Sequence, residues 1–308
     1  MKERSTMEFI KHTSRLAPAL VAAAFIAGLA TSGHAADDTA KKEAEKAASS
    51  DVLRVCASST EAPYSTEDED GFENKIAKIV ADEMGRDVEF VWMDRPAIYL
   101  VRDMLNEKKC DVVIGLDDGD PRVLTTEPYY RTSYVFVQPA DSDLEIDSFD
   151  SKDLYEAHPI GFDPGGPVET MLKKVGLYNR NFNYHRSLTN FKSRRNAYVR
   201  INPTTFITDL KSGKADVAIV FAPEIARYVT NDDAVKMTPV PDENYRVDGE
   251  PVPFHFSQAM GVRKGDEELL KELNAALEKS RPQIQAVLEE EGIPLQEIPE
   301  KKKPESKS

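Results

Sequence analysis

One pattern occurs twice in this sequence, and it is the strongest constraint on the fold. A leucine, five intervening residues and an aspartate precede an apolar run at two places: Leu105 and Asp111 before 112–114, and Leu210 and Asp216 before 217–219. Continuous apolar runs of this kind are typical of strands that are buried on both faces of a parallel sheet. The repeat therefore predicts two similar α/β lobes, with chance similarity of one helix-to-strand joint as the alternative.

The segments around the first joint alternate between strand and helix. Short apolar runs predict strands, and apolar residues at helical spacing predict helices between them. The expected strands are 53–57, 88–92 and 111–115, and the expected helices are 72–84 and 98–105. Alternation of this kind over about 65 residues favours a parallel, doubly wound sheet.

The second half of the chain repeats this organisation and then returns to the first lobe. A strand at 160–162 and a helix at 168–175 open the second unit, and a long amphipathic helix at 267–291 closes the chain. Two chain crossings between lobes favour a hinge and a cleft. The expected boundaries are 52–138 with 258–296 for lobe 1, and 139–257 for lobe 2.

Both ends of the chain look different from its middle. Residues 1–35 combine a basic start, the apolar run 16–30 and small residues before Ala35, which is typical of a cleaved secretory signal peptide. An uncleaved membrane anchor is the alternative reading of this segment. Residues 36–51 read as a flexible tether and 297–308 as a disordered tail. We therefore expect a periplasmic protein without stable membrane insertion after cleavage, and a monomer when free.

Charge and cysteine content exclude several classes of protein. The chain has 40 Lys and Arg against 54 Asp and Glu, a net charge of −14, which argues against nucleic-acid binding. Two cysteines are too few for a disulfide scaffold or a four-cysteine zinc site. Cys56 ends the first strand and Cys110 begins the third, an offset of about three residues or roughly 10 Å. This exceeds the reach of a disulfide, so two buried free thiols are favoured, while a bridge stays open because export leads to an oxidising compartment.

Signatures of enzymes and metal sites are weak in this chain. The three histidines outside the predicted signal peptide are scattered, and neither a G-x-S-x-G elbow nor a phosphate-binding loop occurs. The acidic run 66–71 resembles a calcium loop but starts with Thr66 and places Ala77 where a bidentate Glu is needed. We expect no catalytic residue, no bound metal and no cofactor.

Several runs carry a resemblance to a known family. The Gly71-Phe72 start of the first helix, Pro128-Tyr129-Tyr130 and the segment 261–266 resemble type 2 periplasmic solute-binding proteins. The chain is more specifically similar to the MxaJ (MoxJ) family of accessory proteins in methanol oxidation. The runs that carry this likeness are 109–115, 119–126, 187–193 and 221–229.

The resemblance implies both a fold and a function. The fold is a two-lobed α/β periplasmic-binding-protein architecture with a central cleft and two crossover strands. The function is help in the assembly, maturation or activation of a PQQ-dependent methanol dehydrogenase, the implied partner. The related family that serves lanthanide-type dehydrogenases is a nearby alternative. A solute-binding protein of an ABC transporter, with a small periplasmic ligand, is the competing class.

The same resemblance suggests cleft residues, each with a structural alternative. In solute-binding relatives an Arg after the third strand binds a ligand carboxylate, and Arg122 occupies that place, but nearby aspartates favour a structural Arg–Asp pair. Tyr64 is either a lid or a wall, and Glu224 either faces the cleft or caps a helix. The turn 165–167 either binds an anion or simply opens a helix. The cleft candidates are Tyr64, Asp117, Arg122, Tyr129, Asp163, Gly165, Gly166 and Glu224.

One segment reverses the charge of the chain. Residues 178–202 contain six bases, no acid and several interleaved aromatic residues. Arg and aromatic side chains contribute strongly to interfaces, so the segment is a candidate docking surface for an acidic partner, and a solvated crossover is the alternative. The docking candidates are Arg186, Phe191, Lys192, Arg194, Arg195 and Arg200.

Overall fold

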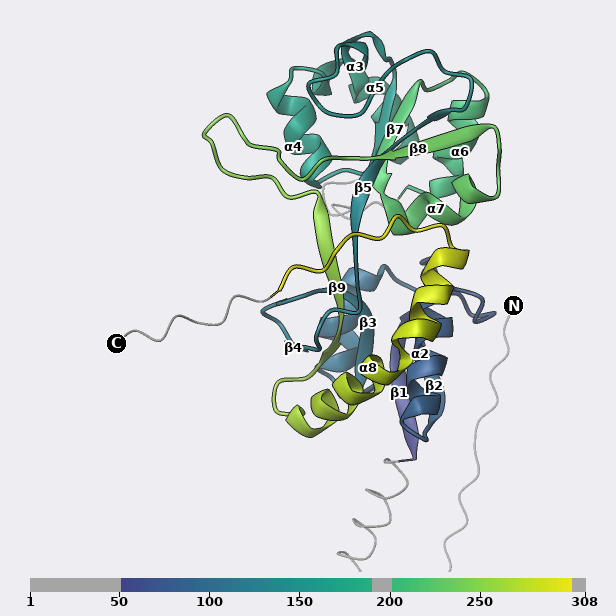
Figure 1. Cartoon of the computed structure of the whole chain (residues 1–308), viewed down its shortest axis with the longest axis vertical. Coiled ribbons are helices and arrows are strands. Elements are labelled where there is room, and N and C mark those ends of the chain that lie inside the picture. Colours follow the sequence, from purple (N-terminus) through teal and green to yellow (C-terminus); the bar gives the residue numbers. More distant parts are fainter. Residues whose placement is uncertain (1–50, 190–200, 301–308) are drawn as a thin grey trace, which may run out of the picture. The chain divides into compact units, whose positions relative to one another are not determined.

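The computed structural model describes residues 51–189 and 201–300 (Figure 1). The predicted signal peptide, nearly all of the predicted tether and the last part of the predicted tail lie outside these residues. Within the described part, no helix combines the length and the apolar character needed to cross a membrane.

Strands and helices alternate along the chain, as the sequence predicts. The strands are β1 (Val52–Ser58), β2 (Asp87–Met93), β3 (Val112–Asp117), β4 (Leu124–Thr125), β5 (Tyr130–Pro139), β6 (Ile160–Phe162), β7 (Val217–Phe221), β8 (Val235–Pro239) and β9 (His255–Val262). The helices are α2 (Phe72–Glu83), α3 (Lys152–Glu156), α4 (Pro167–Lys174), α5 (Tyr178–Thr189), α6 (Pro203–Lys211), α7 (Ala222–Thr230) and α8 (Glu267–Glu290). The predicted helix 98–105 is instead a 3₁₀ turn, η1 (Ala97–Tyr99), followed by a π-helical turn, η2 (Val101–Leu105).

The strands form a mixed sheet in the order β2-β1-β3-β9-β5-β7-β6, with β4 beside β9 and β8 beside β5. Strand β1 runs parallel to β2 and β3, and β6 runs parallel to β7. Both predicted joints feed a buried strand of a parallel pair, since Leu105 ends η2 before β3 and Leu210 lies in the last turn of α6 before β7. The repeat in the sequence therefore reflects two similar structural units.

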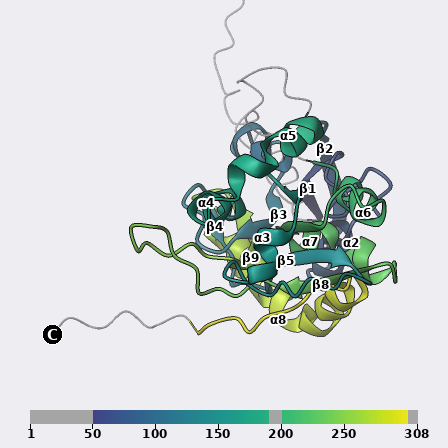
Figure 2. The same cartoon turned by 90° about the horizontal axis from the view of Figure 1, so that it is seen from above.

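Strands β5 and β9 are the two crossover strands. The first half of β5, 130–133, pairs with β9, and its second half, from Tyr134 onward, pairs with β7 and β8. Strand β9 also pairs with β3 and β4. The middle of the loop 240–254 between β8 and β9 projects away from the strands in both views, while Val240, Val252 and Phe254 near its ends are buried (Figures 1 and 2).

The apolar cores divide along the chain. Two clusters draw on β1, α2, β3 and α8, and two others draw on the chain between Val135 and Phe254. Ala226 of α7 is an exception, because it packs with the α2 and α8 cluster. These clusters support the lobe boundaries that we propose, 52–138 with 258–296 and 139–257.

The chain after α8 turns back along crossover strand β5. The Thr132 hydroxyl donates to the carbonyl of Pro294 at 2.8 Å, and the backbone N–H of Gln296 donates to the carbonyl of Arg131 at 2.8 Å. Ile293 is buried in the α2 and α8 cluster. Residues 293–296 therefore form a C-terminal strap that crosses beside β5 (Figure 1).

Candidate functional site

A cavity of about 310 Å³ opens where β1, β3 and β7 reach their carboxyl ends. In open α/β sheets this edge is the usual place for a ligand. Residues of β1, α2 and β3, together with the loops that follow β1 and β3, form most of the lining, and Phe221 and Glu224 contribute from the junction of β7 and α7. The cavity is thus built mainly on the first lobe and completed by the second.

The cavity brings together only part of the predicted cleft residues. Tyr64, Asp117, Arg122 and Glu224 line it, and Asp163 interacts with Glu224. The other three candidates are not among its lining residues: Tyr129, Gly165 and Gly166. The lining residues that the sequence did not single out include Glu61, Glu73, Asn74, Phe221 and Gln258.

Arg122 is held by a neighbouring aspartate. Its Nε lies 3.0 Å and 3.1 Å from the two carboxylate oxygens of Asp120, and its Nη2 lies 2.6 Å from Oδ2. The guanidinium lowers the pKa of Asp120. This is the Arg–Asp pair that the nearby aspartates predict. Asp120 thereby takes up the Arg122 guanidinium, the group that binds a ligand carboxylate in solute-binding relatives.

Asp117 ends strand β3 and points its carboxylate at a neutral donor. Gln258 of β9 donates from Nε2 to Oδ1 of Asp117 at 2.7 Å. Burial is the main cause that raises the pKa of Asp117 above its usual value. An amide donor leaves the negative charge in place, so Asp117 keeps an acidic character at the cavity wall.

Glu73, in the first turn of α2, lies against the backbone of Gly115. A Cβ at position 115 would clash with the Glu73 carboxylate, and Gly115 has φ +70°, so a glycine is required there. Among the described residues the Glu73 carboxylate has no hydrogen-bond or ion-pair partner. Burial raises the pKa of Glu73 to about 8. Glu73 directly follows the Gly71-Phe72 motif at the start of α2, so its position in the motif is the sequence signal for this site.

Replacing Glu73 with glutamine should flatten the pH dependence of stability. Unfolded Glu73 loses its proton near its ordinary pKa of 4.5, whereas the folded group keeps it until about pH 8. The free energy of unfolding of the unmodified protein should therefore fall as pH rises through this window. The titratable groups around Glu73 are Tyr64, Tyr129 and Tyr130, which burial keeps protonated there, and Glu224 and Asp117 near those tyrosines.

Urea unfolding at several pH values between about 4.5 and 8 measures this slope. Glu67→Gln is the control, since Glu67 is exposed and lies outside the cavity lining. Equal slopes for Glu73→Gln and the unmodified protein would contradict the assignment.

Asp163 and Glu224 meet because they follow two neighbouring parallel strands. Asp163 comes directly after β6, and Glu224 lies in the first turn of α7 after β7. Burial and the Glu224 charge raise the pKa of Asp163, while the backbone N–H of Ile201 donates to its Oδ1 at 3.2 Å. A carboxylate in a first helical turn is also favoured by the helix dipole, so the two readings of Glu224 are compatible.

Tyr64 and the turn at Gly165 take structural positions. The ring of Tyr64 packs on Phe72 with centroids 5.0 Å apart, and burial raises the pKa of its hydroxyl. The backbone N–H of Gly165 donates to Glu169 of α4 at 2.8 Å. That N–H is therefore occupied by an acid of its own helix, which weakens the case for an anion at this turn.

Comparisons with known proteins identify the family. Residues 53–286 match the bacterial extracellular solute-binding proteins, family 3. Protein MoxJ of Methylorubrum extorquens is 48% identical over 273 residues, which cover 88% of this chain and 91% of the relative. Protein MoxJ of Paracoccus denitrificans is 46% identical over 244 residues, 79% of this chain and 88% of the relative. The chain belongs to the MoxJ family of bacterial extracellular solute-binding proteins.

Solved structures agree with membership of the MoxJ family. The crystal structure of MxaJ from Methlophaga aminisulfidivorans is 49% identical, covers 79% of this chain and all of that chain, and has a TM-score of 0.76. The periplasmic binding protein XoxJ from Methylobacterium extorquens is 28% identical, covers 80% of this chain and all of that chain, and has a TM-score of 0.59. The two-lobed binding-protein fold and the resemblance inferred from the sequence are thus confirmed.

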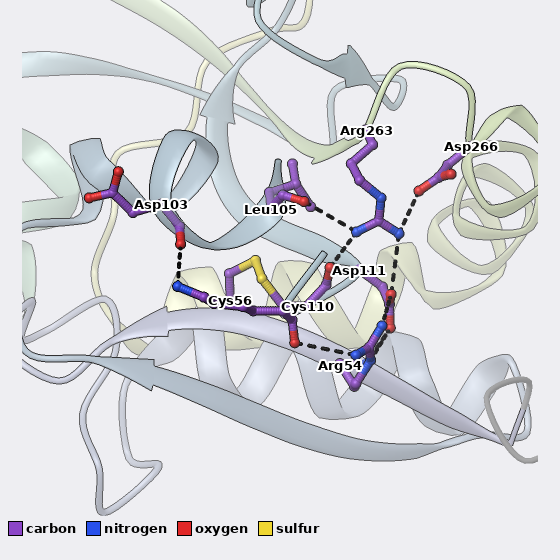
Figure 3. Close-up of a disulfide and its surroundings, with 9 residues drawn as sticks. Arg54, Cys56, Asp103, Leu105, Cys110, Asp111, Arg263 and Asp266 are labelled. Atoms are coloured by element: carbon purple, nitrogen blue, oxygen red, sulfur yellow. Dashed lines mark hydrogen bonds and ion pairs between the residues drawn. A yellow bond between two sulfur atoms is a disulfide. The ribbon is translucent and has the colours of Figure 1, made fainter. Parts of the chain in front are cut away.

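In this MoxJ-family chain, Cys56 and Cys110 form a disulfide, so the expectation of two free thiols is wrong (Figure 3). Their Cα atoms lie 5.4 Å apart. The register of β1 and β3 is as the sequence predicts, with Cys56 beside Val113. Cys110, however, precedes β3 in a bent segment after Lys108, which has φ 58°, so strand rise does not apply to it.

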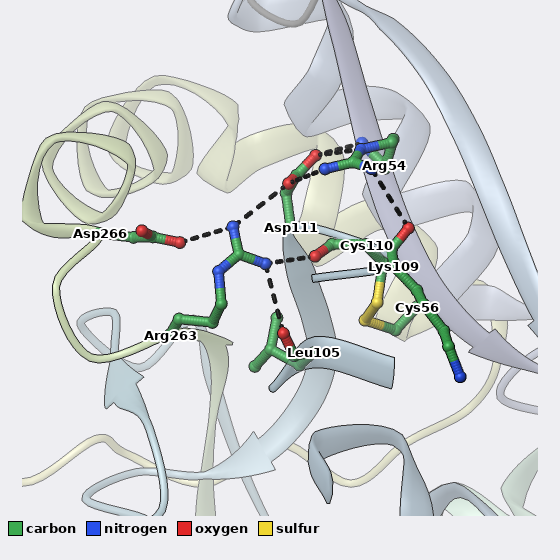
Figure 4. A network of polar contacts seen from close by, with 8 residues as sticks. All are labelled: Arg54, Cys56, Leu105, Lys109, Cys110, Asp111, Arg263 and Asp266. Atoms are coloured by element: carbon green, nitrogen blue, oxygen red, sulfur yellow. Dashed lines mark hydrogen bonds and ion pairs between the residues drawn. A yellow bond between two sulfur atoms is a disulfide. The ribbon is translucent and has the colours of Figure 1, made fainter. Parts of the chain in front are cut away.

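A polar network fixes this bent segment of the MoxJ-family chain (Figure 4). Asp111 accepts from Arg54 at 2.7 Å and 2.9 Å, and from Arg263 at 3.3 Å. Arg263 also donates to the carbonyl of Cys110 and pairs with Asp266 at 2.7 Å. The network explains the family motif at 261–266 as a structural clamp on the turn that carries Cys110.

Most predicted docking residues lie outside the described part of this MoxJ-family chain, namely Phe191, Lys192, Arg194, Arg195 and Arg200. Arg186 is exposed on α5, a helix where the sequence suggested a long crossover. Asn181 anchors α5 by accepting from the N–H of Ile160 at 2.7 Å, and Tyr184 donates to Asp209 at 2.8 Å. The docking surface therefore stays a prediction.

Proposed function

We propose that this protein is a periplasmic accessory protein of methanol oxidation. It helps the assembly, maturation or activation of a PQQ-dependent methanol dehydrogenase through protein docking, and it is not itself an enzyme. The observation that carries the proposal is the 48% identity to a MoxJ protein over 91% of that relative's length. The MxaJ structure is more similar than the XoxJ structure, 49% against 28% identity, which favours the partner of the MxaJ branch.

The cavity supports this reading over uptake of acidic solutes. A ligand that carries a carboxylate needs a free basic side chain in the cavity. Among the described lining residues the one base is Arg122, and it is already paired with Asp120. The second candidate function is a solute-binding protein of an ABC transporter. It is favoured by the match to the solute-binding family and by the cavity at the carboxyl ends of the strands.

Tagged protein incubated with a periplasmic extract should retain the methanol dehydrogenase, identified by mass. Reversing two bases of the docking segment, Arg194→Glu with Arg195→Glu, should lower retention several-fold at low salt, because opposite surface charges steer and hold the partner. Added salt screens these charges, so it should reduce the difference in dehydrogenase retention between the unmodified protein and the variant.

The matched control reverses two exposed bases elsewhere, Lys152→Glu with Lys271→Glu, and keeps the same net charge. Unchanged retention by the Arg194 and Arg195 variant would remove the docking segment from the proposal. Failure of the unmodified protein to retain any dehydrogenase would contradict the function and favour the solute-binding alternative.

A further inference from the structure

The cavity is lined by more acidic than basic side chains. Its described lining residues include one base, Arg122, against five carboxylates: Glu61, Glu73, Asp117, Asp120 and Glu224. Four of these acids already have a partner. Asp120 holds Arg122, and Glu61 accepts from the backbone N–H of Ala97 at 3.1 Å. Asp117 accepts from Gln258 at 2.7 Å, and Glu224 interacts with Asp163. Among the described residues, Glu73 and Glu224 form no ion pair with a base, and Arg122, whose charge also acts on Asp117, is held by Asp120.

Glu73 is the group that most needs a partner. Its carboxylate lies beside Gly115, at the wall of the cavity, and takes no hydrogen bond from any described residue. A buried carboxyl group without a donor keeps its proton, as the raised pKa of Glu73 shows, and a cation within about 4–6 Å would favour its charged form. The backbone is shaped around this side chain at Gly115, so its place at the cavity is built into the fold.

The apolar part of the lining suits an organic cation better than a metal ion. Tyr64, Phe90 and Phe221 present aromatic rings to the cavity. Aromatic rings attract ammonium and guanidinium groups, whereas hard metal ions require several oxygen ligands close together. Among the described residues, no group of three or more His, Cys, Asp or Glu is arranged to hold a metal.

We propose that this cavity binds a small organic cation, a primary ammonium or a guanidinium, and that it selects against ligands that carry a carboxylate. The volume of about 310 Å³ admits one such molecule. A zwitterionic amino acid would bring its carboxylate to a wall that offers Asp117 and Glu224 and no free base. The selection against carboxylate ligands therefore has two causes: Asp120 pairs with Arg122, and Asp117 and Glu224 repel a carboxylate.

The same chemistry has two sources, a free amine and a Lys or Arg side chain of a polypeptide. The inference does not depend on docking of a dehydrogenase, so the two proposals can fail separately. If cation binding is absent while the dehydrogenase is retained, only this inference fails.

Isothermal titration of the signal-free protein with agmatine and with arginine tests the selection, because the two ligands differ only by the α-carboxylate. We expect agmatine to bind at least about tenfold more tightly than arginine. Nα-acetyl-arginine methylamide represents a side chain within a polypeptide. Tighter binding of agmatine supports the proposal with a free amine as the source, and tighter binding of the blocked arginine supports it with a polypeptide.

Two variants locate the bound cation. Glu73→Gln and Glu224→Gln should each weaken agmatine binding about tenfold or more, and the exposed control Glu67→Gln should leave it unchanged. Circular dichroism melts establish whether each variant is folded. If one of the two variants does not fold, the other still tests the proposal. Arginine binding as tightly as agmatine, no cation binding at about 1 mM, or binding unaffected by both variants would overturn the proposal.

Discussion

Replacing Cys56 and Cys110 together by alanine is expected to lower the free energy of unfolding by about 4 kcal/mol. The disulfide closes a loop across a sequence separation of 54 residues, and its removal enlarges the set of unfolded conformations. Both cysteines are also buried beside η2 and β3, so the exchange to alanine removes some packing as well. Urea unfolding of the variant and the unmodified protein measures the loss.

Reduced unmodified protein is the matched control for this variant. It keeps both sulfur atoms in the core and lacks only the bond, so it separates the effect of the bridge from that of packing. Reduction should account for most of the loss. Equal urea midpoints for the oxidised and reduced protein would show that the bridge contributes no stability.

Replacing Arg227 with methionine is expected to lower the free energy of unfolding by about 3–5 kcal/mol. Arg227 of α7 forms a bidentate pair with Glu291, at 2.6 Å and 2.7 Å, just beyond α8. The side chain of Glu291 is only 4% exposed, so loss of Arg227 leaves a buried carboxylate with Lys75, 3.6 Å away, as its one remaining cation in the described structure. The pair joins an element of the second lobe to the end of the first.

A double-mutant cycle tests whether this effect belongs to the pair. The combined variant Arg227→Met with Glu291→Gln should lose less free energy of unfolding than the sum of the two single variants. The reason is that the combined variant removes both charges and leaves neither of them unpaired. Arg281→Met is the control, since its partner Glu278 is exposed and such a surface pair contributes at most about 1 kcal/mol. Additive losses in the cycle would show that the two residues act independently.

Much of the fold followed from local patterns in the sequence. The buried runs at 112–114 and 217–219 predicted parallel strands because each lies in the middle of a sheet and is covered on both faces. Helix α5 was missed because one of its buried anchors is polar. Asn181 is 1% exposed and satisfies the N–H of Ile160, which no search for apolar spacing detects.

The candidate site was harder to predict, for two physical reasons. Glu73 lies on a helix face that otherwise packs on the sheet, and only the approach of Gly115 from a distant strand turns its position into a cavity wall. The expected separation of Cys56 and Cys110 was wrong because it assumes strand geometry at Cys110, whereas β3 begins only at Val112. By contrast, the Arg122–Asp120 pair spans two positions, and local spacing was enough to predict it.

The C-terminal strap has a consequence for the order in which the protein folds. Leu53 of β1 and Ile293 of the strap belong to one apolar cluster, so this core is assembled from segments about 240 residues apart in the sequence. The clusters between Val135 and Phe254 use a continuous stretch. During synthesis the continuous stretch is complete first, and domains generally fold as they emerge. The other core is completed only after Ile293 has been synthesised.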